Sequence, residues 1–235
     1  MVPAARFFPM GDRAIVVEFG DRMDVALSAH IAALAQRLRD SRPIGVRDIV
    51  PAYTTLTLHY DPAAVGAGSS PYEALAETIG SWIERQPAGA SIEGRTVEIP
   101  VCYGGAFGED LEPLARTRGL SVDEAIAIHS ETTYYVHLLG FVPGFAYLGG
   151  LDARLSMPRR QTPRPRVPAG SVAIANEQTA VYPLETPGGW QVIGRTPLQL
   201  FRPDAMPPSV LNAGDAVRFV PISAQRFASL SGGRA

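Results

Sequence analysis

The sequence has 235 residues, a net charge of −2 and a single cysteine, Cys102. This length favours one large domain or two small ones, and the lone cysteine excludes an intramolecular disulfide and is typical of a cytoplasmic protein. The near-neutral charge argues against a nucleic-acid binder, and no apolar run is long enough to span a membrane. All 21 basic residues are arginines, which excludes Schiff-base, P-loop and biotin-carrying lysines in this sequence.

The first part of the chain combines strand and helix patterns. Residues 14–19 form an apolar run that predicts a buried strand, and residues 54–60 alternate as in a half-buried antiparallel strand. Between them, apolar residues recur at helical spacing after Asp24, which is a suitable N-cap. The helical stripe consists of Leu27, Ile31, Leu34 and Leu38.

A second helix is predicted to begin after Ser70. Pro71 occupies its first position, and Glu73 stands three residues after Ser70, as in a capping box. Strands followed by helices in this order indicate a small α+β sandwich, with its helices packed on one face of an antiparallel sheet.

The C-terminal half has a different pattern. Residues 121–131 predict another capped helix, with Ser121 and Glu124 as the capping pair. Beyond Tyr134 the helical spacing disappears, and short strand candidates alternate with Gly/Pro turns. Many short strands with such punctuation favour a β-barrel or β-sandwich.

These patterns divide the chain into four segments. We expect an N-terminal α+β domain at residues 1–86, a linker of small and polar residues at 87–94, a β-rich domain at 95–225 and a tail at 226–235.

Two segments carry the polar groups that chemistry would need. Five arginines fall within residues 154–166. They form either an anion-binding rim or a solvated proline-rich loop, since arginine binds carboxylate and phosphate with a rigid fork. Residues 176–197 gather amide, hydroxyl, indole and guanidinium groups around a sharp turn, as the pocket for a small polar substrate requires. His129 is either a general acid/base or a structural histidine.

The usual catalytic motifs are absent from the sequence. It contains no zinc-ligand spacing, no GxSxG nucleophile elbow, no GxGxxG fingerprint and no Walker A motif. The residues therefore indicate a polar pocket in the second half, without defining a reaction.

Four long motifs carry a resemblance that covers nearly the whole chain, from Phe8 to Ile222. They are PVCYGGAFGEDL, HLLGFVPGFAYLGGLD, AGDAVRFVPI and the segment TPRPRVPAGSVAIANEQTAVYPLETPGGWQVIGRTPLQLF. The chain resembles the 5-oxoprolinase B-subunit family, which includes proteins named allophanate hydrolase subunit 1 and the sporulation-kinase inhibitor KipI. Asn176 and Ala180 depart from glycines expected in many relatives.

The resemblance implies a small α+β domain followed by a cyclophilin-like β-barrel. It also implies a complex with a homologue of the 5-oxoprolinase C subunit and a lactam-utilising third subunit, which together convert 5-oxo-L-proline to L-glutamate with ATP hydrolysis. Without a nucleotide motif, this chain is expected to hold no cofactor itself, so the ATP chemistry is assigned to its partners. The alternatives are a histidine-kinase inhibitor without catalysis and a urea/allophanate-type carboxyltransferase subunit.

Within the matched motifs we assign residues to a site for a small anionic substrate. The apolar loop at 138–150 is expected to lie beside the pocket, where its glycines permit close backbone approach and Tyr147 helps to form the pocket wall or the subunit seam. The candidate catalytic residues are His129, Arg164 and Arg195. The candidate substrate-binding residues are Phe145, Gln178, Thr179, Tyr182, Gly188 and Trp190.

Overall fold

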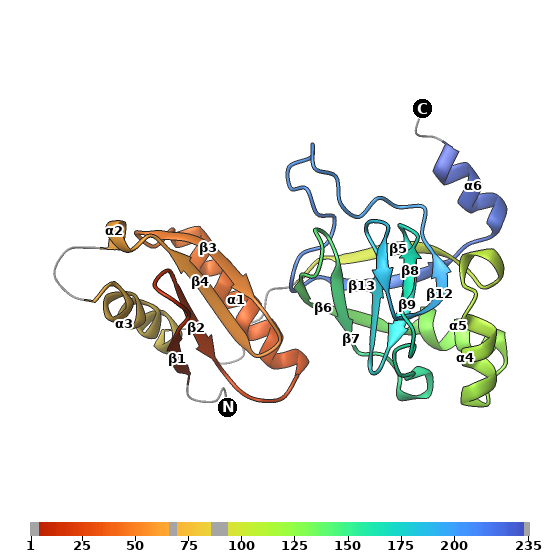
Figure 1. Ribbon diagram of the computed structural model, residues 1–235, viewed down its shortest axis with the longest axis horizontal. Helices are drawn as coiled ribbons and strands as arrows, with labels where there is room; N and C mark the ends of the chain where they lie inside the picture. Colours follow the sequence, from red (N-terminus) through yellow and green to blue (C-terminus); the bar gives the residue numbers. More distant parts are fainter. Residues whose placement is uncertain (1–4, 66–69, 86–93, 233–235) are drawn as a thin grey trace. The chain divides into compact units, whose positions relative to one another are not determined.

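A computed structural model describes residues 5–65, 70–85 and 94–232. The chain divides into two compact units, Met1–Glu93 and Gly94–Ala235 (Figure 1). The linker expected at residues 87–94 lies outside the described residues except for Gly94. Among the described residues, no helix has both the length and the apolar character needed to cross a bilayer.

The first unit is a four-stranded antiparallel sheet with strand order β1-β2-β4-β3. Alternate residues of β4 are buried, and they share one core with residues of the two long helices, α1 and α3. One face of the sheet therefore packs against the helices, as the period of two predicts. The elements are β1 Arg6–Pro9, β2 Ala14–Glu18, α1 Val25–Ser41, β3 Val46–Pro51, β4 Thr55–Tyr60, α2 Pro62–Val65 and α3 Pro71–Glu84.

The two predicted helix starts of this unit differ in their capping. Asp24 caps α1 as predicted, because its carboxylate accepts a hydrogen bond from the Leu27 backbone N–H at 2.8 Å. The capping box predicted at Ser70 is wrong, since the Ser70 side chain forms no capping hydrogen bond. Pro71 still occupies the first turn of α3, where its missing N–H costs nothing.

The second unit is built around a closed barrel of seven strands in the order β10-β7-β6-β13-β5-β12-β9. Strands β5 and β13 are parallel, and the other neighbours are antiparallel. Strands β8 and β11 form a separate pair. The strands are β5 Thr96–Tyr103, β6 Thr133–Leu139, β7 Ala146–Gly149, β8 Arg164–Val167, β9 Ser171–Ala175, β10 Gln178–Val181, β11 Thr186–Gly188, β12 Gln191–Arg195 and β13 Ala216–Pro221.

Helices α4, α5 and α6 of this unit gather on one side of the barrel (Figure 1). The capping box predicted for α5 is confirmed: Ser121 Oγ accepts from the Glu124 N–H at 3.2 Å, and the Glu124 carboxylate accepts from the Ser121 N–H at 2.7 Å. Most of the segment assigned to a tail belongs to α6. The helical elements are η1 Gly105–Phe107, α4 Leu111–Arg118, α5 Val122–Glu131, η2 Ala153–Leu155 and α6 Ala224–Gly232.

The predicted α+β class, with a small sandwich followed by a β-barrel, is confirmed. Residues of the barrel strands and of helices α4 and α5 form one apolar cluster, and a second, smaller cluster draws on other side chains of some of the same strands. This second cluster positions the candidate site.

Candidate functional site

The barrel wall carries an outer apolar cluster where β7, β9 and β10 lie side by side. Phe145 and Tyr147 belong to this outer cluster, whereas Ala146 and Leu148 belong to the barrel core. The separation follows from the alternation of side chains along an extended strand. The residues that β9 and β10 contribute to the outer cluster are alanines, and their small side chains leave space for the indole of Trp190.

A cavity of about 250 Å³ opens on this outer cluster. Its walls are mostly aromatic: the ring centroids of Phe145 and Trp190 are 5.9 Å apart, and those of Phe145 and Tyr182 are 5.2 Å apart, both nearly perpendicular. Apolar walls with few polar groups are typical of small-molecule pockets. The lining residues are Phe141, Phe145, Tyr147, Arg159, Pro163, Tyr182, Pro187, Gly188, Gly189 and Trp190.

Arg159 supplies the positive charge of this cavity. Its guanidinium carbon lies 5.9 Å from the centroid of the Trp190 ring. No carboxylate among the described residues forms a salt bridge with Arg159, although four of its arginine neighbours are paired. A guanidinium beside an apolar wall, with no carboxylate partner in the described part of its own chain, is suited to bind a carboxylate of a ligand.

Two phenol groups face the same cavity in their neutral form. Burial raises the pKa of Tyr182 and of Tyr147 above the ordinary value, against the opposing charge of Arg159. The Tyr182 hydroxyl is hydrogen-bonded by the backbone of Trp190 and lies directly beneath Gly188, where an added Cβ would come within 2.4 Å of it. Gly188 is therefore required for the position of this hydroxyl, which can donate a hydrogen bond to a ligand.

Asp110 fastens the segment that carries Arg159 to the pocket wall. Its buried carboxylate accepts from Arg160 at 3.0 Å, from Arg164 at 2.8 Å and from the Val192 N–H at 2.6 Å. The backbone N–H of Arg160 also donates to the Gly189 carbonyl at 2.7 Å. Arg164 also pairs with Glu109 at 2.8 Å, so its guanidinium is committed to holding the loops together and does not line the cavity.

His129 lies inside the protein, away from this cavity. The Thr179 hydroxyl donates to the Ala173 carbonyl at 3.1 Å and so accepts from His129 Nε2–H at 3.0 Å. The remaining nitrogen, Nδ1, then accepts from the Tyr103 hydroxyl at 2.7 Å. Complete burial lowers the pKa of His129 to about 3, and its ring stacks on Phe219 at 4.6 Å. This arrangement is that of a neutral histidine which ties α5 to three barrel strands.

Two other predicted residues also lie outside the cavity lining. Arg195 donates from Nε to the Ala169 carbonyl at 2.9 Å, at the end of β12. Gln178 begins β10, opposite Ala175 of β9. Neither residue is among those that line the cavity.

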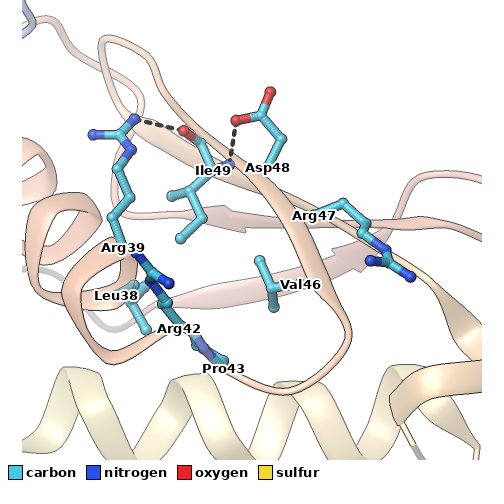
Figure 2. A pocket seen from close by; sticks show the side chains of 8 residues that line it. All are labelled: Leu38, Arg39, Arg42, Pro43, Val46, Arg47, Asp48 and Ile49. Carbon is cyan, nitrogen blue, oxygen red and sulfur yellow. Dashed lines mark hydrogen bonds between the residues drawn. The ribbon is translucent and has the colours of Figure 1, made fainter.

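The first unit has a cavity of its own, of about 280 Å³, between the end of α1 and strand β3 (Figure 2). Its polar groups serve the edge strand: Arg39 donates to the Ile49 carbonyl at 2.6 Å, and Asp48 accepts from the Ile49 N–H at 2.8 Å. The Arg47 side chain points away from the cavity and pairs with Asp61 at 2.7 Å. We therefore take the cavity of the second unit as the candidate site.

The described residues contain no candidate metal site. Within residues 5–65, 70–85 and 94–232, no three His, Cys, Asp or Glu side chains are grouped so that they could hold a metal ion.

Comparison with known proteins shows the family. A family model described as "Carboxyltransferase domain, subdomain C and D" matches residues 5–211. A Bacillus subtilis protein named as the B subunit of 5-oxoprolinase is 44% identical over 93% of this chain and 93% of its own length. One of the same name from Escherichia coli O157:H7 is 43% identical over 92% of this chain and 96% of its own. The chain belongs to the 5-oxoprolinase B-subunit family.

Solved structures agree with this membership. TTHA0988 is 36% identical with a TM-score of 0.79, over 90% of this chain but only 40% of its own. PH0987 from Pyrococcus horikoshii is 44% identical with a TM-score of 0.56, over 94% of this chain and all of its own. The urea amidolyase of K. lactis, at 17% identity and a TM-score of 0.72, shows that the fold extends to larger proteins, of which this chain spans 15%.

In this member of the B-subunit family the structure brings together only some of the predicted site residues. Phe145, Tyr182, Gly188 and Trp190 line the cavity, with Tyr147, whereas the five others do not. Five lining residues were not predicted, and two of them, Phe141 and Arg159, carry an aromatic ring or a charge; the other three are Pro163, Pro187 and Gly189. In the sequence, Arg159 is one of five clustered arginines. No local signal distinguishes it, because its lack of a salt bridge among the described residues depends on which neighbouring arginines pair with Asp110.

Proposed function

We propose that this chain is the B subunit of a 5-oxoprolinase and that it contributes the pocket that receives 5-oxo-L-proline. The observation that carries the proposal is the 44% identity to a protein of that name along almost the full length of both chains. The pocket supports it: 5-oxoproline is a flat five-membered lactam with one carboxylate, and the cavity combines aromatic walls with the guanidinium of Arg159.

The proposed binding mode follows from the chemistry of the lining residues. Arg159 holds the carboxylate, the ring lies against Trp190, and the neutral Tyr182 hydroxyl donates to the lactam carbonyl oxygen. A charged hydrogen bond of this kind contributes about 1.5–3 kcal/mol. The three groups orient the lactam carbonyl and leave the proton transfers to other residues.

The reaction needs ATP because resonance stabilises the lactam carbonyl against water. Transfer of the terminal phosphoryl group of ATP to the carbonyl oxygen releases ADP and gives an activated C–O–P group. A first water adds to the same carbon, the ring C–N bond breaks and the nitrogen takes a proton, which gives γ-glutamyl phosphate. A second water then cleaves this acyl phosphate to L-glutamate and phosphate. The sequence has no nucleotide-binding motif, so we assign ATP binding to the partner subunits, a homologue of the C subunit and a lactam-utilising third subunit. The single cysteine is consistent with a cytoplasmic complex.

The test is reconstitution of the complex with its partner subunits. Glutamate formation and 5-oxoproline-dependent ATP hydrolysis should require this chain, and Arg159→Ala should raise the KM for 5-oxoproline. The carboxamide analogue of 5-oxoproline is the matched ligand control, because it keeps the lactam and lacks the charge. Glutamate formation at the same rate without this chain would refute the proposal.

A carboxyltransferase role is the second candidate, since the family model carries that description and a Lachancea kluyveri urea amidolyase is 22% identical over 96% of this chain, which spans 14% of that protein. Carboxyl transfer of that type would need a biotinylated lysine on another chain, because this sequence has no lysine. Inhibition of the complex by avidin would support this candidate, and activity that avidin leaves unchanged would support 5-oxoprolinase.

A further inference from the structure

Three large apolar side chains are exposed in the described part of the second unit. Phe141 is 63% exposed, Leu184 is 39% exposed and Met206 is 95% exposed. They come from three separate segments: the turn between β6 and β7, the connection after β10, and a long hairpin before β13. Solitary exposed apolar residues are ordinary, but a group at one place marks an interaction surface.

The turn that carries Phe141 meets the bases of the two other segments at Gly144. A Cβ added to this glycine would lie 2.7 Å from the Cβ of Phe201 and 3.4 Å from that of Pro183. Pro183 precedes Leu184, and Phe201 closes the hairpin that carries Met206 by bridging to Ser209. Figure 1 shows this hairpin (blue) projecting from the barrel. We call Phe141, Leu184 and Met206 the apolar end of the barrel.

The backbone holds the Phe141 ring outward at a conformational cost. Phe141 has φ +69°, in the left-handed region that bulky residues avoid. Hydrogen bonds fix this turn: the Val142 N–H donates to the Gly140 carbonyl at 2.9 Å, and the Gly140 N–H donates to the Phe145 carbonyl at 3.0 Å. The contacts of the Phe141 ring within this chain leave 63% of the residue exposed, and a binding partner could cover this exposed part.

Phe141 also joins the apolar end to the pocket. Its ring is one of the lining groups of the cavity and lies 5.4 Å from the ring of Phe145, edge to face. A molecule that covers the exposed side of Phe141 would therefore extend the pocket wall on that side.

We propose that a second polypeptide of the complex docks on the apolar end and completes the outer wall of the pocket. This inference rests on the proposed function, since it takes the chain to be one subunit of several. The occupant is indicated by the relatives: their names make them one subunit of an enzyme, and TTHA0988 is a single chain of which this protein matches only 40%. We take the rest of that chain to represent the partner.

The chemistry of the apolar end defines the contact expected of the partner. Aromatic and methionine side chains are enriched at the buried centre of interfaces, where they fill pockets on the other protein. Arg202 and Asp204, both exposed, precede Met206 in the hairpin and would form part of a polar rim. The partner should thus present an apolar depression surrounded by polar groups.

The experiment measures binding of this chain to the polypeptide homologous to the part of TTHA0988 that this chain does not match. Phe141→Ser and Met206→Ser should each raise the Kd at least tenfold and leave the melting temperature of the isolated chain unchanged. Ile44→Ser is the matched control, because Ile44 is 80% exposed and belongs to the first unit. Its Kd should stay within twofold of the natural protein.

Two results would overturn the docking surface. One is an unchanged Kd for both Phe141→Ser and Met206→Ser. The other is sedimentation showing that the isolated chain self-associates and that Met206→Ser dissociates it, because the apolar end would then bind a second copy. A complex that needs both residues but shows no 5-oxoproline-dependent ATP hydrolysis supports the docking surface and contradicts the proposed function. An active complex in which both substituted chains still bind the partner supports the proposed function and contradicts the docking surface.

Discussion

The guanidinium of Arg159 lies over the indole of Trp190, 5.9 Å from the ring centroid, without a carboxylate partner among the described residues. This distance is within the range of a cation–π contact. The neighbouring Arg160 and Arg164 are bound to Asp110, so the charge available to a ligand belongs to Arg159. We therefore propose Arg159 as the anion-binding residue in place of the predicted candidates Arg164 and Arg195.

Replacement of Arg159 should therefore weaken substrate binding and leave the fold intact. Arg159→Ala should raise the KM for 5-oxoproline roughly 10- to 150-fold, the range that corresponds to one charged hydrogen bond of about 1.5–3 kcal/mol. Steady-state kinetics of the reconstituted complex measure this change. Arg166→Ala is the control, because Arg166 is exposed and pairs with Glu185 away from the cavity lining. Equal effects of the two substitutions would contradict the assignment.

The architecture of both units follows from local patterns in the sequence. The alternation at residues 54–60 predicts β4, and the Ser121–Glu124 pair predicts the start of α5, because both depend on neighbours in the chain. The same capping pattern failed at Ser70, where the backbone has φ −54° and ψ 123° and the side chain makes no capping bond. The sequence pattern therefore predicts that a helix or strand exists more reliably than it predicts the capping hydrogen bonds at a helix end.

The candidate site was less accessible to sequence reasoning. Phe145, Tyr182 and Trp190 stand out as aromatics beside glycine-rich turns, and the structure does gather them. The distinction between Arg159 and Arg164 depends on Asp110, which is 54 residues from Arg164 in the sequence. No periodicity or motif reports such a long-range ion pair, and the resemblance did not assign it either.

The close approach of Gly188 to Tyr182 predicts a sharp difference between two adjacent glycines. Gly188→Ala would place a Cβ 2.4 Å from the Tyr182 hydroxyl, so it should lower the melting temperature and raise the KM for 5-oxoproline. Gly189→Ala should be tolerated, because the nearest atom to its Cβ would be 3.7 Å away. Thermal unfolding and kinetics of both variants test this, and a tolerated Gly188→Ala would show that Tyr182 does not need its observed position.

The buried His129 predicts a pH dependence of stability. Its pKa is about 3 in the folded protein, against 6.5 for an unperturbed histidine. Between these values the unfolded chain binds a proton that the folded chain does not, so this residue lowers the free energy of unfolding as the pH falls from about 6.5 to about 3. Each unit of pKa difference corresponds to about 1.4 kcal/mol.

The variant His129→Gln isolates this contribution. Glutamine can accept from the Tyr103 hydroxyl and donate to Thr179 without titrating. Urea unfolding at pH 7.5 and pH 4.5 should therefore show a smaller loss of stability in His129→Gln than in the natural protein. Parallel losses would contradict a buried neutral histidine, and an abolished reaction in a stable His129→Gln complex would restore the acid/base hypothesis.

Asp110 and Arg164 should behave as one structural unit. The Asp110 side chain is 8% exposed and that of Arg164 is 15% exposed, and removing one partner of a buried ion pair strands the charge of the other. Asp110→Asn should therefore lower the free energy of unfolding by on the order of 3 kcal/mol. Arg164→Met should also destabilise the fold. The double variant should lose less than the sum of the two, because it removes both members of this pair and leaves only the more exposed Arg160 without its carboxylate. Urea unfolding of all four proteins measures the coupling.

Two outcomes would contradict this role. Strictly additive losses would mean that the pair does not hold the Arg159 segment. An Arg164→Met variant that is stable but unable to bind 5-oxoproline would return Arg164 to the ligand site.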